Sequence, residues 1–166
     1  MENLKIKKAS LNDIDSIANI NEISLQENYS KDDWIFLSTC GLINVALIKD
    51  EIVGYICLIN INFLDHEETF MHDFIKLIKN LKKNDKSNDI MCIFSFAVLE
   101  NYRNNKIGKK LMESAINENT TYLLNVRKSN TIARQIYTKF GFLEYDKIDK
   151  NYYENPTEDS FIYYKI

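Results

Sequence analysis

The stretch FAVLENYRNNKIGKKLM, residues 96–112, runs from apolar residues through a basic, Asn-rich turn into an amphipathic helical pattern. It predicts a strand that passes directly into a helix. Such a junction brings free backbone N–H groups and the positive end of the helix dipole to one point. Arg103, Lys106 and Lys109 add positive charge around that point. The junction therefore has the chemistry of an anion-binding site.

The turn contains two adjacent asparagines, Asn104 and Asn105. Asparagine tolerates the unusual backbone angles that a nest of N–H groups requires. A phosphate or pyrophosphate is the ligand that fits such a site. For this segment alone, a solvated basic helix start is an equally good interpretation, because single loops of this type give many false matches.

From residue 90 the sequence alternates between strand and helix patterns. Apolar runs predict strands over 90–98 and 121–126. Helical spacing predicts helices over 106–116 and 129–140, the second of which is stopped by Gly141. This strand–helix–strand order predicts that the two strands are parallel.

The beginning of the chain predicts a short strand followed by a helix. Alternation in LKIKKA favours a strand near residues 3–9. Ser10 with Asp13 three residues later is a capping pattern. The apolar face that begins at Leu11 then predicts a helix to about Glu22.

A second capping pattern, Ser30 with Asp33, predicts another short helix that ends near Gly41. The run INVALIKDEIVGYICLINI, residues 43–61, predicts two strands joined by a tight turn at residues 50–51. This part of the chain is therefore expected to form a β-hairpin.

The remaining elements complete one domain. Residues 63–89 are first acidic and then basic, with apolar residues at helical spacing, and predict a helical insertion packed on the core; a docking surface for a partner is the alternative. Two closing strands, near 142–148 and 160–166, flank a polar loop that holds Pro156. Together the patterns predict one α/β domain over residues 1–166, with a mixed, mostly antiparallel sheet and helices on both faces.

The composition is that of a globular protein, since 45% of the 166 residues are hydrophobic and 27% are charged. A net charge of −3 argues against duplex nucleic acid as the main ligand. Apolar runs fall short of the roughly 18 residues that a spanning helix needs, and the N-terminus lacks the apolar core of a signal peptide. We therefore expect a cytoplasmic protein that binds neither a membrane nor nucleic acid.

Cysteine and histidine predict neither a disulfide framework nor a metal site. Cys40, Cys57 and Cys92 form no CxxC pair and are interpreted as free thiols, two of them in apolar runs. His66 and His72 stand among acidic residues, but a third ligand at helical spacing is missing. We interpret these two as surface residues of a helix and expect no metal.

The segment RNNKIG, residues 103–108, resembles the acyl-CoA turn of the GNAT N-acetyltransferases, whose pattern is Arg or Gln, two residues, Gly, one residue, then Gly or Ala. Lys106 stands at the middle glycine, and we expect it to keep ordinary helical angles and to point its side chain outward. The resemblance implies the GNAT fold, with a splayed parallel strand pair, and acetyl-CoA as the cofactor. It places the cofactor in this part of the chain against Ala97, Val98, Arg103, Asn104, Asn105, Lys106, Ile107, Gly108 and Lys109.

The segment NVRKSNTIARQIYTKFGF, residues 125–142, resembles the next strand and helix of the family. The resemblance implies that Asn130 and Ala133 contact the pantetheine arm of the cofactor and that Tyr137 faces its thioester. The three positions are i, i+3 and i+7, which places them on one helical face. Taken alone, such a stripe is more often a packing face with a capping Asn.

The segments LQENY, VRKSN and NYY are similar to protein N-terminal acetyltransferases of the RimI and NatA catalytic-subunit type. In that group, two loops grip the first residues of a peptide from two sides. The resemblance assigns this role to Leu25, Glu27, Tyr29, Tyr152 and Tyr153. The tyrosine pair also has a plainer explanation, as half-buried sheet residues.

The resemblance implies acetyl transfer to an α-amino group, with a protein N-terminus as the expected acceptor. An α-amino group, with a pKa near 8, is partly neutral at cellular pH, so a modest base is sufficient. Glu27 is the candidate base, Tyr137 the candidate proton donor to the thiolate, and a backbone N–H near Val98 the candidate donor to the oxyanion. Several relatives carry a Glu or His where this chain has Asn125, which cannot act as a base.

Two other functions remain open at this point. One is a GNAT enzyme that acetylates a lysine side chain or a small amine. The other is a weakly catalytic CoA-binding or scaffold subunit, which the departures at Lys106 and Asn125 favour. The expected partners are acetyl-CoA and a peptide or small-amine acceptor, with an auxiliary subunit or a homodimer as further options.

Overall fold

The computed structural model describes residues 3–61 and 90–166. The insertion predicted over 63–89, with His66 and His72, lies outside these residues. Of the described helices, none is long and apolar enough to cross a membrane.

The chain divides into two compact units, which we describe separately. Unit 1 comprises Met1–Ile59 and Ile93–Asn117, and unit 2 comprises Asn60–Cys92 and Glu118–Ile166. Strand β4 contributes its first residues to unit 2 and the others to unit 1.

Unit 1 holds the elements predicted for the first half of the chain and the strand-to-helix junction. In chain order they are β1 (Leu4–Lys8), η1 (Leu11–Asp13), α1 (Ile14–Ser24), α2 (Lys31–Cys40), β2 (Gly41–Ile48), β3 (Glu51–Asn60), β4 (Ile90–Val98), η3 (Glu100–Tyr102) and α4 (Ile107–Ala115).

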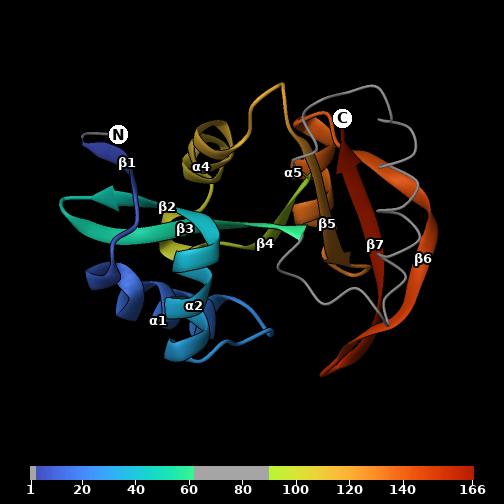
Figure 1. Cartoon of the computed structure of the whole chain (residues 1–166), viewed down its shortest axis with the longest axis horizontal. Coiled ribbons are helices and arrows are strands. Elements are labelled where there is room, and N and C mark those ends of the chain that lie inside the picture. The colour runs from blue at the N-terminus through green and yellow to red at the C-terminus, as the bar shows by residue number, and fades with distance from the viewer. Residues whose placement is uncertain (1–2, 62–89) are drawn as a thin grey trace. The chain divides into compact units, whose positions relative to one another are not determined.

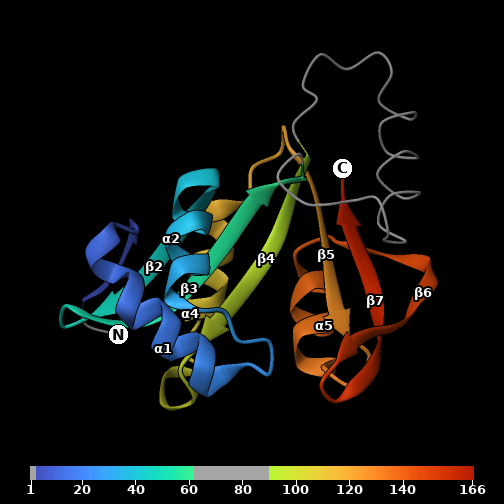
Figure 2. The same ribbon diagram turned by 60° about the horizontal axis from the view of Figure 1, so that its bottom comes forward.

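The strands of unit 1 are covered by helices on both faces. Figures 1 and 2 show α1 and α2 on one face and α4 on the other. This explains why every residue of β3 from Val53 to Ile59 is buried. Successive strand residues point to opposite faces, so a strand covered on both sides must be apolar throughout. Trp34 and Leu111 are fully buried and belong to the two helical layers.

The predicted start of α2 is confirmed, whereas the predicted cap Ser10 begins the 3-10 turn η1 and α1 starts later, at Ile14. At Ser30, the hydroxyl accepts a hydrogen bond from the N–H of Asp33 at 3.2 Å, and the Asp33 carboxylate accepts one from the N–H of Ser30 at 2.8 Å. At Ser10, the carboxylate of Asp13 accepts from both the N–H and the hydroxyl. The prediction for Leu11 is wrong, because this residue lies in the 3-10 turn ahead of α1 and is 67% exposed.

The β2–β3 hairpin is confirmed, but its turn consists of Lys49 and Asp50, one residue earlier than predicted. Both residues have positive φ angles, 50° and 65°. Two such residues make the type I′ turn that matches the twist of the flanking strands. The chain lacks the Asn-Gly pair that usually signals this turn, so the sequence pattern misplaces it.

In its described residues, unit 2 has a sheet of antiparallel strands joined to the start of β4, and a helix that packs against this sheet. Its elements beyond the start of β4 are β5 (Thr121–Arg127), α5 (Thr131–Lys139), β6 (Leu143–Glu154) and β7 (Thr157–Lys165). Gly141, with φ of 80°, follows α5 as predicted. The closing strands are longer than predicted and leave only Asn155 and Pro156 between them. Polar residues obscure the second half of β6 in the sequence, because this edge strand does not need an apolar pattern along its length.

The strands form a mixed sheet in the order β1-β2-β3-β4-β5-β7-β6. The β4–β5 pair is parallel and joins Ile90–Cys92 to Thr121–Leu123. The pairs β1–β2, β2–β3, β5–β7 and β6–β7 are antiparallel. The predicted α/β class with a mixed, mostly antiparallel sheet is confirmed.

Candidate functional site

The junction between β4 and α4 presents a helix N-terminus with free donors. Lys106 is the N-cap of α4, and the first helical hydrogen bond runs from the N–H of Lys110 to the carbonyl of Lys106 at 3.0 Å. The geometry of an α-helix leaves the preceding N–H groups without acceptors inside the helix. These groups belong to Ile107, Gly108 and Lys109.

The turn before α4 contains two residues in the left-handed region. Asn104 has φ of 63°, in agreement with the tolerance expected of asparagine. Lys106 has φ of 61° and ψ of 9°. The expectation that Lys106 keeps ordinary helical angles is therefore wrong: the lysine adopts the conformation that a glycine would take, at a cost of roughly 1–2 kcal/mol. The chain path demanded by the turn outweighs the preference of the side chain.

Two contacts hold this turn against the end of β4. Nε of Arg103 donates a hydrogen bond to the carbonyl of Val98 at 2.9 Å. Gly108 lies so close to β4 that an added Cβ would stand 3.1 Å from the ring of Phe96. The small residue at 108 thus allows α4 to begin directly against the strand, where Ala97 is buried.

The cations around the junction differ in their partners. Lys109 and Lys110 both approach the carboxylate of Glu113, at 3.5 and 3.3 Å. Lys106 makes no ion pair within the part of the chain that the structure describes. The start of α4 therefore combines free N–H donors with excess positive charge.

The loop between α1 and α2 carries the predicted acceptor residues Leu25, Glu27 and Tyr29. Asn21 of α1 holds it, because Nδ2 donates to the carbonyl of Glu27 at 2.9 Å and Oδ1 accepts from the N–H of Tyr29 at 3.1 Å. The ring of Tyr29 also lies 4.9 Å from that of Phe94 on β4, between centroids. The structure thus brings this loop to β4 within unit 1.

In unit 2, helix α5 presents the predicted stripe on one face. The side chain of Asn130 caps the helix and accepts a hydrogen bond from the N–H of Ala133 at 3.0 Å. Tyr137 is 7% exposed and packs against the rings of Phe142 and Tyr163, at centroid distances of 5.7 and 6.2 Å. Burial raises the pKa of Tyr137 above its ordinary value, so the phenol is protonated at neutral pH.

The second predicted acceptor element, Tyr152 and Tyr153, lies near the tip of the β6–β7 hairpin. The two rings make an edge contact at 4.9 Å. The guanidinium of Arg127 lies over the ring of Tyr153 at 4.2 Å. Tyr152 is 41% exposed. Arg127 therefore holds the ring of Tyr153, whereas Tyr152 faces solvent.

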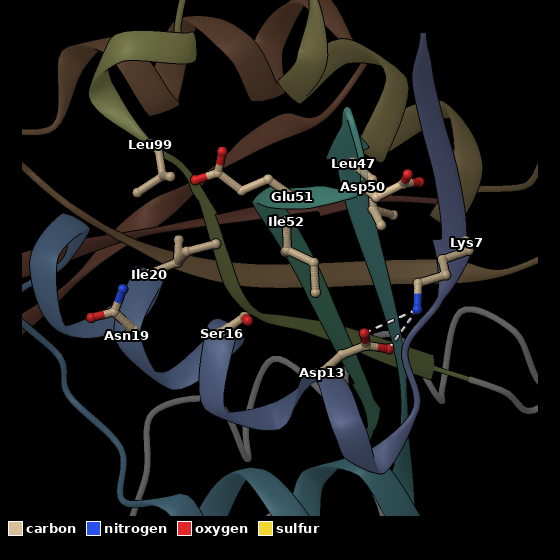
Figure 3. Close-up of a pocket in the computed structure, with 10 residues that line it drawn as sticks. All are labelled: Lys7, Asp13, Ser16, Asn19, Ile20, Leu47, Asp50, Glu51, Ile52 and Leu99. Atoms are coloured by element: carbon tan, nitrogen blue, oxygen red, sulfur yellow. Dashed lines mark hydrogen bonds and ion pairs between the residues drawn. The ribbon is translucent and has the colours of Figure 1, made fainter.

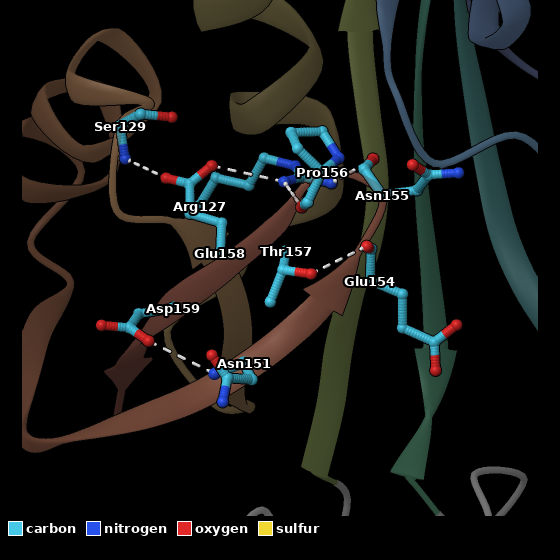
Figure 4. A network of polar contacts seen from close by, with 9 residues as sticks. All are labelled: Arg127, Ser129, Asn151, Glu154, Asn155, Pro156, Thr157, Glu158 and Asp159. Carbon is cyan, nitrogen blue, oxygen red and sulfur yellow. Dashed lines mark hydrogen bonds and ion pairs between the residues drawn. The ribbon is translucent and has the colours of Figure 1, made fainter.

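Arg127 ties this hairpin to the end of β5. Figure 4 shows its guanidinium beside Glu158 and the carbonyls of the hairpin turn. It donates to the carbonyls of Asn155 and Pro156 at 3.1 and 3.0 Å and pairs with Glu158 at 3.3 Å. Glu158 in turn accepts a hydrogen bond from the N–H of Ser129, just before α5. The network therefore connects the Tyr152–Tyr153 segment to the loop that starts α5.

Each unit assembles a part of the predicted set. In unit 1, the loop of residues 25–29 contacts β4 at Phe94, and the turn at the start of α4 contacts the end of β4 at Val98. Unit 2 brings together the stripe on α5 and, through Arg127, the tyrosine pair of β6.

The three cysteines lie outside the predicted set of site residues. All three are free, as predicted. Burial raises the pKa of Cys92 to about 12, and it also raises that of Cys40. A thiol with such a pKa is not a nucleophile at neutral pH, so these two groups do not support a covalent acyl-cysteine route.

Comparison with known proteins identifies the family. The model of the acetyltransferase (GNAT) family matches residues 9–142. The chain belongs to the GNAT acetyltransferase family. A relative from Sulfurisphaera tokodaii, named N-alpha-acetyltransferase, is 31% identical over 169 residues, which cover 95% of this chain and 90% of the relative.

Two solved GNAT structures share the fold. Ard1 from Thermoplasma volcanium has a TM-score of 0.74 at 23% identity, covering 98% of this chain and 97% of its own. Naa50 from Arabidopsis thaliana, solved with the bisubstrate analogue CoA-Ac-MVNAL, has a TM-score of 0.74 at 19% identity and covers 98% of both chains.

The chain departs from the GNAT pattern at two places. Lys106 replaces the middle glycine but retains the backbone conformation that glycine would allow. At Asn125, where the resemblance led us to expect a Glu or His in several relatives, Nδ2 donates to Ser160 Oγ at 2.7 Å. The Asn125 Oδ1 is buried and has no hydrogen-bond donor among the described residues. An amide cannot accept a proton as a base, so the second departure removes a proton acceptor from β5.

A separate pocket of about 390 Å³ lies in unit 1, beside α1 and the β2–β3 turn. None of the predicted site residues lines it. Figure 3 shows its one lysine, Lys7, already paired with Asp13, at 2.8 Å. Ile20, Ile52 and Leu99 supply apolar lining. The pocket therefore offers a satisfied ion pair rather than reactive groups.

The sequence patterns missed two residues that hold the site, Asn21 and Arg127. Both are buried polar residues, and the position of each in the sequence pattern could have indicated it. Asn21 follows the buried face of α1, and Arg127 ends an apolar strand. A polar group on a buried face must find a partner, and here the partners are the main chain of the loop of residues 25–29 and of the β6–β7 turn.

Proposed function

We propose that the protein transfers the acetyl group of acetyl-CoA to an α-amino group, and that the acceptor is the N-terminus of a protein. The name of the Sulfurisphaera tokodaii relative supports the α-amino acceptor. The observation in this chain that carries the proposal is the start of α4, where free N–H groups and two left-handed residues lie in the turn between η3 and α4, beside the end of β4.

This junction fits the pyrophosphate of acetyl-CoA. The amides of Ile107, Gly108 and Lys109 supply donors, and the helix dipole favours a negative charge at that point. Arg103 and Lys106 add positive charge. Gly108 packs closely against Phe96, and this packing keeps these donors beside the end of β4.

The stripe on α5 is proposed to hold the other end of the cofactor, with Asn130 and Ala133 against the pantetheine arm. Tyr137 is assigned as the proton donor to the sulfur. Burial raises its pKa, so the phenol carries its proton at neutral pH and its hydroxyl can point a hydrogen at the sulfur when the C–S bond breaks. Acetyl-CoA itself supplies the activated acetyl group.

The resemblance assigns the acceptor to two elements, the loop of residues 25–29 in unit 1 and the tyrosine pair of β6 in unit 2, and we propose that each contacts the acceptor. The neutral amine forms the new N–C bond, and Glu27 accepts the proton that its nitrogen releases, directly or through water. Tyr137 protonates the departing thiolate and is reprotonated from solvent, to which Glu27 returns its proton. A backbone N–H near Val98 is assigned to the oxyanion.

We propose that the reaction takes place in the cytoplasm, where protein N-termini are made. Because Asn125 cannot serve as a second base, Glu27 carries the proton transfer alone in this proposal. The neutral fraction of an α-amino group at cellular pH makes one modest base sufficient.

The experiment compares three acceptors with acetyl-CoA and follows the release of free thiol. The first is a peptide with a free N-terminus and no lysine, the second is the same peptide with a blocked N-terminus and one lysine, and the third is a small amine. We expect thiol release with the first, together with one acetyl group at the N-terminus by mass spectrometry. Reaction with only the second or third would assign a side-chain or small-amine acceptor.

Absence of turnover despite binding of acetyl-CoA by calorimetry would assign a scaffold role instead. Gel filtration of the active species, alone and from a cell extract, shows whether it is a single chain, a homodimer or a complex with an auxiliary subunit.

A further inference from the structure

Asn21 is a fully buried amide whose hydrogen bonds reach the acceptor loop and the sheet at once. Its contacts to Glu27 and Tyr29 are both to the main chain. One is a carbonyl, which only accepts, and the other is an N–H, which only donates. This pair of opposite groups fixes the orientation of the amide and demands a side chain that donates and accepts at adjacent atoms. At this position asparagine meets the demand, whereas aspartate and leucine do not.

Two further buried residues, Tyr55 and Ser95, support the side chain of Asn21 through hydrogen bonds. Nδ2 of Asn21 lies 3.2 Å from the hydroxyl of Tyr55 on β3. That hydroxyl lies 2.7 Å from Oγ of Ser95 on β4. Tyr55 is fully buried, and Ser95 is 6% exposed. A continuous chain of side-chain hydrogen bonds thus runs from β4, through β3 and α1, to the loop.

Such a network has stringent requirements, because an unpaired polar group inside a protein is costly. Each of the three side chains orients the next. The loop is also short. Five residues separate Ser24, the end of α1, from Ser30, the cap of α2. Asn21 bonds to two of those five, Glu27 and Tyr29.

We propose that Asn21, supported by Tyr55 and Ser95, is a positioning residue that fixes the acceptor loop and thereby sets the affinity of the enzyme for its acceptor. The inference rests on the proposed function, in which this loop contacts the acceptor peptide. Asn21 acts through the main chain of Glu27 and Tyr29 and does not touch the reacting atoms. Its loss therefore changes the binding of acceptor and leaves the binding of acetyl-CoA in place.

The test compares Asn21→Ala with a matched control, Asn44→Ala. Asn44 is also a buried asparagine of unit 1, but its amide donates to the carbonyl and hydroxyl of Ser114 on α4, at 3.1 and 3.0 Å. Both variants lose a buried amide. For Asn21→Ala we expect the KM for peptide to rise about tenfold, the effect of losing hydrogen bonds at a buried group. We expect the KM for acetyl-CoA to stay within about twofold of wild type, and both KM values of Asn44→Ala to do the same.

Hydrogen exchange gives a second measurement that does not depend on turnover. In wild type the amide of Tyr29 is protected by Asn21. In Asn21→Ala this amide should lose protection, while the amides of α1 and α2 keep theirs. A global loss of protection across both helices would mean that Asn21 only stabilises the fold, and would overturn the proposal.

Milder variants cover the case in which Asn21→Ala does not fold. Tyr55→Phe and Ser95→Ala each remove one hydroxyl from the network, and we expect each to raise the KM for peptide about threefold. Unchanged values in both would overturn the proposal. If wild type acetylates no peptide, the proposed function itself fails. If it acetylates peptides and Asn21→Ala behaves like Asn44→Ala, only the positioning role of Asn21 fails.

Discussion

Lys106 adopts a left-handed backbone conformation that is usually adopted by glycine. Its φ of 61° lies in the region that glycine adopts without steric cost. We expect Lys106→Gly to raise the free energy of unfolding by about 1 kcal/mol, measured by urea denaturation.

The same substitution tests what binds the phosphates. If the backbone amides of α4 carry the binding, Lys106→Gly keeps or increases the affinity for acetyl-CoA in calorimetry. Lys106→Gln is the control, because it removes the charge but keeps the conformational cost. A marked loss of affinity in both variants would make the ammonium group a phosphate ligand.

Tyr137 is the residue whose hydroxyl the proposed reaction requires. Tyr137→Phe keeps the ring contacts with Phe142 and Tyr163 and removes only the donor. We expect kcat to fall about 100-fold, at the low end of general acid catalysis, while the dissociation constant of acetyl-CoA changes little. Equal losses in kcat and affinity would show that the ring merely lines the site.

Glu27 is tested by the pH dependence of the rate. The neutral fraction of an α-amino acceptor falls as the pH drops below about 8, so a base is most useful at low pH. We therefore expect Glu27→Gln to slow acetylation more at pH 6, about two units below the pKa of the amine, than at pH 9, about one unit above it. The measurement is the ratio of wild-type to variant kcat/KM across this range, and a constant ratio would remove Glu27 from the mechanism.

At the level of elements, the β6–β7 hairpin depends on Arg127. The side chains of Arg127 and Glu158 are only 10% and 20% exposed, and breaking a buried pair from one side is costly. We expect Arg127→Ala to lower the free energy of unfolding by roughly 3 kcal/mol. Lys128→Ala removes the neighbouring pair with Asp159, in which the lysine is 54% exposed, and should cost less than about 1 kcal/mol. Similar losses in the two urea titrations would contradict the role of Arg127.

The elements also show which local signals are reliable. The capping pattern at Ser30 predicts α2 correctly, because the partners of a cap lie three residues apart and need no tertiary contact. The turn at Lys49 and Asp50 is predicted one residue late, since strand pairing, and not the turn residues, sets its register. The second half of β6 is missed for a similar reason, as its polar residues are ordered by pairing with β7.

For the whole molecule, carboxylates bound in the fold link stability to pH. Burial alone would raise the pKa of Asp13, but the bonds from Lys7 and Ser10 outweigh it and hold the pKa below its ordinary value of 3.8. A lowered pKa stabilises the fold above the ordinary value, and this stabilisation is lost as the pH falls through the lowered one. We expect the free energy of unfolding to decline below about pH 4, and to decline less in Asp13→Asn.

The control for this prediction is Asp15→Asn. It removes an exposed ion pair with Lys31, in which both side chains are more than half exposed, and should leave the pH dependence of wild type in place. An identical decline in wild type and Asp13→Asn would show that other groups govern acid unfolding.

The sequence by itself determined the family and the order of most elements, and it predicted the residues of the candidate site. These features depend on spacing within short segments: a cap and its partner, a turn and its helix, a stripe at i, i+3 and i+7. The tertiary structure alone decided the left-handed backbone of Lys106, the support of the loop of residues 25–29 by Asn21, Tyr55 and Ser95, and the anchoring of the hairpin by Arg127. Tyr55 stands 34 residues from Asn21 along the chain, and Ser95 another 40. Hydrogen bonds between such distant positions exist only after the strands have paired and excluded water. The spacing of residues within short segments therefore cannot predict them.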